Sequence, residues 1–108
     1  MNILLVDGAV LLNPLREAGH NVLHFSPSGV GMASVRPVLE QNAFVPDLVI
    51  QAEHLANRLL LDDLPQIRCS KIFWSIDSHL NLFWHRYYAR LFDAVLTPHL
   101  SLWQALPP

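Results

Sequence analysis

Five short apolar runs alternate with segments of helical spacing along this chain of 108 residues, and that alternation constrains the fold more than any other feature. The runs cover residues 2–6, 22–25, 48–50, 72–76 and 94–97. Short continuous apolar runs are typical of strands buried on both faces of a parallel sheet. Helices between such strands, joined by right-handed crossovers, predict a Rossmann-like three-layer α/β sandwich with a parallel sheet of about five strands.

Helix signals lie between these runs. Asn13 followed by Pro14 predicts a first helix with Asn13 as its N-cap, and Gly19 predicts where that helix ends. Apolar residues at helical intervals predict further helical segments. These segments cover residues 35–42, 58–63, 80–92 and 101–106.

The length of the chain predicts a single domain over residues 1–108. The composition is 52% hydrophobic and 15% charged, which is more apolar than an average soluble domain. A sheet buried on both faces explains this excess, and so does a partner domain or subunit that covers part of the surface. In the second case we expect a fragment of a longer protein, with self-association through an exposed apolar face.

The net charge, the apolar runs and the cysteine content argue against several classes of protein. A net charge of -2 gives no electrostatic basis for binding nucleic acid or an anionic membrane. No apolar run approaches the roughly 20 residues of a membrane span, and Asp7 ends the first run too early for a secretory signal. Cys69 is the single cysteine, so no internal disulfide forms and a reducing, cytoplasmic location is expected.

Polar residues follow each apolar run, at positions that the fold brings to one edge of the sheet. Ligands of such sheets bind outside the carboxyl ends of the strands. The candidate substrate-binding residues are Asp7, Gly8, Glu53, His54 and Trp84. Asp7-Gly8 also fits a tight turn, and no G-x-G-x-x-G dinucleotide signature is present. Gln51 ends the third run where a response-regulator receiver carries Asp, which argues against a phosphoacceptor.

The turn Asp77-Ser78-His79 after the fourth run is the main catalytic candidate. A carboxylate and an imidazole so close together fit a base and its orienting partner, with Asp77 and His79 in these roles. The alternative is structural, because Asp77 or Ser78 also suits the N-cap of the following helix.

Glu53, His54, Asp77 and His79 lack the H-x-x-x-H or C-x-x-C spacing of metal ligands. We therefore expect no metal and no other cofactor. A serine hydrolase is also disfavoured, because the chain has no G-x-S-x-G turn.

The helix predicted over residues 80–92 has two faces. One is expected to pack into the core and carries Leu80, Phe83, Trp84, Tyr87, Tyr88 and Leu91. The other carries Asn81, His85, Arg86, Ala89 and Arg90. Trp84 also suits stacking on a sugar. Arg86 and Arg90 lie one helical turn apart. Such a pair can bind a phosphate group, and the alternative is that both side chains face solvent.

Residues 46–99 resemble the N-terminal domain of bacterial glycosyltransferases of the two-Rossmann-domain type, GT-B. The nearest group is the glycosyltransferase-like proteins related to spore maturation. The resemblance is carried by the sequence FWSIDSH at residues 73–79, the aromatic helix after it, and DAVLT at residues 93–97. It implies transfer of a sugar from a nucleotide-sugar to an acceptor, by a fold that does not need a bound metal. The N-terminal domain of such enzymes shapes the acceptor side, and the C-terminal domain holds most of the nucleotide-sugar.

The same resemblance implies a base or a substrate contact after the first or fourth strand, where this chain has Asp7, Asp77 and His79. The nucleotide-sugar donor is expected to bind through a C-terminal domain, so residues 1–108 alone are expected to be inactive. The donor sugar, the acceptor and the choice between retaining and inverting chemistry stay open. The alternative, motivated by the apolar composition, is a non-catalytic α/β ligand-binding or protein-interaction module, a degenerate receiver-like domain.

Overall fold

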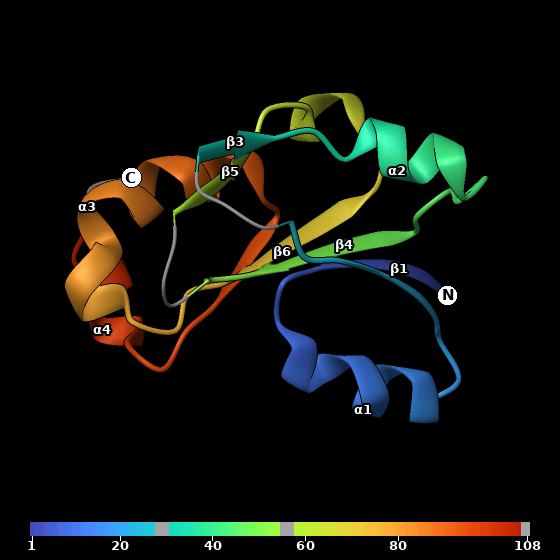
Figure 1. Cartoon of the computed structure of the whole chain (residues 1–108). Helices are drawn as coiled ribbons and strands as arrows, with labels where there is room; N and C mark the ends of the chain where they lie inside the picture. Colours follow the sequence, from blue (N-terminus) through green and yellow to red (C-terminus); the bar gives the residue numbers. More distant parts are fainter. Residues whose placement is uncertain (28–30, 55–57, 107–108) are drawn as a thin grey trace.

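The main sheet has five parallel strands in the order β2-β1-β4-β6-β7 (Figure 1). The computed structural model describes residues 1–27, 31–54 and 58–106. The strands of the main sheet are β1 (Asn2–Val6), β2 (Asn21–Phe25), β4 (Leu48–Ala52), β6 (Ser70–Trp74) and β7 (Ala94–Leu96). The predicted parallel α/β sandwich is thereby confirmed, and each predicted strand is present with shifts of a few residues at its ends.

Two further strands form a small separate sheet. β3 (Gly31–Ala33) and β5 (Leu59–Leu61) pair in parallel, with Met32 opposite Leu60. The helix predicted over residues 58–63 is therefore wrong. Leu59 and Leu61 are buried and Leu60 is less so, which is the two-residue period of a strand. Three consecutive leucines do not reveal that period by themselves; the pairing with β3 imposes it.

The four α-helices lie close to their predicted places, whereas the 3₁₀ turn η2 was not predicted. The helices and 3₁₀ turns are η1 (Ala9–Leu11), α1 (Leu12–Glu17), α2 (Arg36–Gln41), η2 (Leu64–Gln66), α3 (Ser78–Tyr88), η3 (Ala89–Leu91) and α4 (Leu100–Gln104). The N-cap predicted at Asn13 is wrong, because η1 continues directly into α1 and Leu11 takes that position. Gly19 ends α1 as predicted, with φ 93° and a bond from its N–H to Arg16 O.

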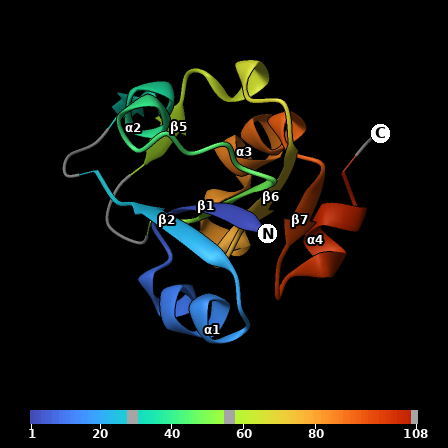
Figure 2. The ribbon, with the colours of Figure 1, turned by 90° about the vertical axis from the view of Figure 1, so that its right-hand side faces the viewer.

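Helices cover the main sheet on both faces (Figure 2). α1 packs on one face through Leu11, Leu12 and Leu15. α2, α3 and the small sheet pack on the other, where the larger core lies. That core contains Leu4, Val6, Val35, Leu39, Val49, Leu59, Leu61, Leu64, Ile67, Phe73, Tyr88 and Ala89. The chain changes direction across the sheet between β1 and β4, and this switch point is where ligands of open α/β sheets bind.

The packing face of α3 differs from the prediction. Its fully buried side chains include Ser78 and His85, while Phe83 is 58% exposed. Leu80, Tyr87 and Leu91 are exposed on the same outer side. The predicted apolar face is thus wrong for these four residues, and holds for the buried Tyr88 and the half-buried Trp84. The cause is that hydrogen-bonding partners for Ser78 and His85 lie beneath the helix.

Candidate functional site

Asp7 stands at the carboxyl end of β1, beside the switch point of the sheet. It is 4% exposed, and its φ of 56° is left-handed, which is uncommon for a non-glycine residue. Ser26 donates its hydroxyl to Asp7 Oδ1 at 2.9 Å. The other carboxylate oxygen, Oδ2, is buried without a hydrogen-bond partner among the described residues. A buried carboxylate oxygen without a hydrogen bond costs free energy, so such oxygens normally have a partner. Strained backbone conformations are also common at binding sites. Both features are consistent with a ligand that donates a hydrogen bond to Oδ2.

Gly8 brings the turn after β1 close to β4. Its φ is 58°, and a Cβ atom at this position would lie 2.8 Å from Ala52 Cβ. Packing alone therefore requires glycine here, and a contact between Gly8 and a substrate stays a prediction.

Glu53 follows β4 and is buried against the start of α3. Its Oε2 accepts the backbone N–H of Asp77 at 2.8 Å, and its Oε1 accepts the side-chain amide of Asn81 at 3.2 Å. Glu53 therefore caps α3. The predicted capping by Asp77 or Ser78 is wrong, because no side chain at the N-cap position makes a capping bond. Burial raises the pKa of Glu53, and the backbone bond from Asp77 opposes that rise.

A chain of buried polar contacts, here called the serine–histidine network, joins β6, α3 and the segment after β7. Ser75 Oγ lies 2.6 Å from Ser78 Oγ and 2.8 Å from His85 Nδ1. Ser78 Oγ also lies 2.9 Å from Thr97 Oγ1 and accepts the indole N–H of Trp103 at 2.9 Å. The sequence reasoning missed this network, whose one signal was the seven-residue spacing of Ser78 and His85 on one side of a helix.

His85 also approaches Glu53, with Nε2 at 3.0 Å from Oε1. The orientation does not make a hydrogen bond, so Nε2 has no hydrogen-bond partner among the residues described. Burial lowers the pKa of His85 to about 4, although the negative charge of Asp77 acts in the opposite direction. The ring is therefore neutral at neutral pH. The order Ser75, His85, Glu53 resembles a hydrolase triad, but Ser75 and His85 are fully buried, so no substrate reaches the hydroxyl.

Two imidazoles meet at the surface of the same edge. His79, in the first turn of α3, places Nδ1 at 3.2 Å from Nε2 of His99 at the start of α4. His79 is exposed and Asp77 beside it is half-buried. The structure thus brings Asp77 and His79 to a solvent-facing edge together with a second histidine, His99, which was not among the candidate site residues.

The remaining candidates lie nearby in different settings. Trp84 is half-buried, donates its indole N–H to Asn81 Oδ1 at 3.1 Å, and carries the Arg58 guanidinium 5.5 Å from its ring centroid. His54 is half-buried, directly after Glu53. Residues 28–30, which follow β2, and residues 55–57, which follow His54, lie outside the described residues.

Over residues 1–27, 31–54 and 58–106, no three His, Cys, Asp or Glu side chains gather in a group that would hold a metal ion. No helix in the same residues has the length and apolar character needed to cross a membrane. No protein-family model, curated protein or solved structure matches this chain.

Proposed function

We propose that this chain is the acceptor-side, Rossmann-like domain of a GT-B glycosyltransferase, which transfers a sugar from a nucleotide-sugar to an acceptor. The observation that carries the proposal is the buried Oδ2 of Asp7 at the switch point of the sheet, which has no hydrogen-bond partner within residues 1–27, 31–54 and 58–106. A hydroxyl of a saccharide or another polyol satisfies this oxygen by donating a hydrogen bond to it.

The charge of the edge favours a hydroxylated ligand over a phosphorylated one. The segments 7–8, 26–27, 51–54, 75–79 and 97–99 contain carboxylates and imidazoles but no Lys or Arg. The N-terminus of α3, where a helix would bind phosphate, already holds the Glu53 carboxylate. The edge therefore suits an acceptor, and the diphosphate of the donor belongs to a second domain in this proposal.

His79 is the proposed base in an inverting reaction. The acceptor hydroxyl gives its proton to His79 Nε2 while its oxygen forms a bond to the anomeric carbon. The bond from that carbon to the phosphate oxygen breaks, and the nucleoside diphosphate leaves with the electron pair. His99 orients the ring by accepting the Nδ1 proton of His79, and the half-buried Asp77 stabilises the charge that develops.

Titration of the 108-residue chain with neutral mono- and disaccharides, followed by two-dimensional NMR, tests the proposal. Saturable shifts are expected at Gly8, Glu53 and His79, and Asp7→Asn should weaken them. Glu17→Gln, a change at an exposed carboxylate on α1, is the matched control and should have no effect. Absence of saccharide shifts at this edge, or equal binding by Asp7→Asn, contradicts the proposal. Sugar transfer by the chain alone contradicts the expectation that it is inactive without a donor domain.

The strand order favours a second candidate function. Counting the main-sheet strands along the chain, the order is that of flavodoxin-like and receiver domains, 2-1-3-4-5. Together with the exposed outer side of α3, it fits a non-catalytic protein-interaction module. That module would show no saccharide shifts at the edge, so the same titration separates the two candidates.

A further inference from the structure

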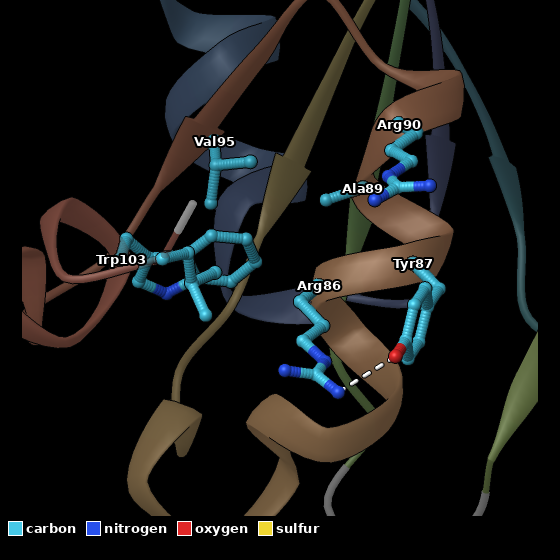
Figure 3. A pocket seen from close by; sticks show the side chains of 7 residues that line it. Arg86, Tyr87, Ala89, Arg90, Val95 and Trp103 are labelled. Carbon is cyan, nitrogen blue, oxygen red and sulfur yellow. Dashed lines mark hydrogen bonds between the residues drawn. The ribbon is translucent and has the colours of Figure 1, made fainter. Parts of the chain in front are cut away.

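An open pocket lies on the flank of the edge strand β7, between α3 and α4 (Figure 3). Its volume is about 500 Å³, within the range of sites for small molecules. Its lining residues are Arg86, Tyr87, Ala89, Arg90, Val95, Trp103 and Leu106. None of them belongs to the segments of the carboxyl edge that carry Asp7 and His79, and the pocket meets that edge only where Trp103 donates its indole N–H to Ser78.

One wall of the pocket is cationic and its charge is not neutralised. Residues 78–106 contain three charged side chains, Arg86, Arg90 and Asp93. Asp93 accepts the backbone N–H of Lys71 at 2.7 Å. In the described part of the chain, neither arginine has a carboxylate within ion-pair distance. Two adjacent cations without a counter-ion, on a chain of net charge -2, favour an anionic ligand.

Tyr87 holds the two arginines in place. Arg86 Nη2 donates to the Tyr87 hydroxyl at 2.6 Å, and its Cζ lies 4.6 Å from the ring centroid. Arg90 Cζ lies 5.5 Å from the same centroid. Cation–π contacts of this kind restrict the long side chains and reduce the entropy lost when they bind a ligand.

The opposite wall is apolar and includes a flat ring. Trp103 lies across the pocket from Arg86 in Figure 3, and its bond to Ser78 Oγ fixes the indole. Val95 continues this surface, and Ala89 lies on the arginine-bearing side, between Arg86 and Arg90 in the sequence. A ligand that contacts both walls therefore needs an anionic group at one end and a planar, apolar group at the other.

We propose that this pocket binds a phosphomonoester of a planar ring, with Arg86 and Arg90 on the phosphate and Trp103 against the ring. A guanidinium donates two parallel hydrogen bonds to phosphate oxygens, and two guanidinium groups match a dianion. The proposal does not depend on the glycosyltransferase assignment, because it uses other residues and another class of ligand.

Phenyl phosphate is the probe, and two-dimensional NMR of the 108-residue chain is the readout. Saturable shifts are expected at Arg86, Arg90 and the Trp103 indole N–H, with affinity that falls as salt is added. The double variant Arg86→Gln/Arg90→Gln should bind at least about tenfold more weakly. Arg68→Gln, at an exposed arginine elsewhere, is the matched control and should bind as the unmodified chain does.

Phenol and inorganic phosphate test the two halves of the ligand, and each should bind more weakly than phenyl phosphate. Circular dichroism of the double variant establishes that it is folded. Equal binding by the double variant overturns the proposal, and so does inorganic phosphate that binds as tightly as phenyl phosphate. Absence of shifts at the pocket up to millimolar phenyl phosphate overturns it as well.

Discussion

The carboxylate of Glu53 accepts the backbone N–H of Asp77 at 2.8 Å, so a residue from the end of β4 caps the helix that follows β6. The same carboxylate binds Asn81 and lies beside His85. One buried side chain therefore fixes the start of α3 and the position of the turn that carries Asp77 and His79.

Glu53→Ala should lower the free energy of unfolding by about 2–4 kcal/mol, because it leaves the part-buried backbone N–H of Asp77 without its acceptor and removes one of the two acceptors of the Asn81 amide. Urea unfolding of the variant measures this loss. Glu17→Ala removes an exposed carboxylate on α1 and should change stability by less than about 0.5 kcal/mol. Similar losses in the two variants would show that the cap contributes little.

Acidification should destabilise the chain through His85. Its pKa is lowered from 6.5 to about 4 in the folded protein, so the unfolded state binds more protons between these values. Stability is therefore lost as pH falls through this window, by up to about 3 kcal/mol. Glu53 acts in the opposite direction, because its raised pKa gives stability that is lost as pH rises. The shift of His85 is the larger, so a net loss on acidification is expected.

Urea midpoints measured across this pH window check the prediction. His85→Gln should flatten the dependence on pH even though the variant is less stable at every pH, whereas His20→Gln, at a half-exposed ring, should leave the slope nearly unchanged. If the urea midpoint of His85→Gln depends on pH as steeply as that of the unmodified chain, other titratable groups cause the loss of stability.

Gly8→Ala should destabilise the fold more than Gly19→Ala does. Both glycines have positive φ, but a Cβ at Gly8 meets Ala52 Cβ at 2.8 Å and a Cβ at Gly19 meets nothing within 4 Å. Gly19→Ala should therefore cost about 1 kcal/mol of backbone strain, and Gly8→Ala about 2–3 kcal/mol. Adding Ala52→Gly should recover part of the difference, which a double-mutant cycle in thermal unfolding measures. Additive effects of the two substitutions would contradict the contact.

The exposed side of α3 should drive self-association. Leu80, Phe83, Tyr87 and Leu91 lie at helical intervals on this side and are all exposed. The prediction is an apparent mass that rises with concentration in light scattering, and a lower mass for Phe83→Lys. Val10→Lys, at an apolar residue of η1 that is more exposed than Phe83, is the control and should have little effect. A strictly monomeric profile at all concentrations counts against the prediction.

The sequence predicted the five main strands because each is a local apolar run, and the fold rules then determined their parallel pairing. It did not predict the β3–β5 sheet, because those segments are short and acquire strand character from each other. It also assigned the exposed Leu80, Phe83, Tyr87 and Leu91 to the core, and it placed the buried His85 on the outer face. Helical spacing does not determine how far the buried face extends, which here depends on Ser75 and Glu53, in the segments after β6 and β4.

For the candidate site, the sequence predicted which residues lie at the edge of the sheet but not which atoms they contact. The edge that carries Asp7, Asp77 and His79 follows from the fold class. The unpaired oxygen of Asp7 and the contact between His79 and His99 depend on backbone angles and on packing between distant elements. No local pattern encodes these distances, so the sequence alone identified the residues without their partners.

Under the function proposed above, His79→Ala should lower the rate of sugar transfer by about 100-fold or more in a protein that joins this chain to a donor domain, because the acceptor hydroxyl would lose its proposed base. His99→Ala should have a smaller effect, since the proposal gives His99 only the role of orienting the ring through the 3.2 Å contact.

A purely structural role for His79 would change stability and leave the pH dependence of kcat unaltered. A base instead moves the acidic limb of that profile, so pH profiles of the unmodified enzyme and of His79→Gln separate the two roles. Full activity in His79→Ala would exclude this residue, and full activity in Asp77→Asn would exclude its neighbour.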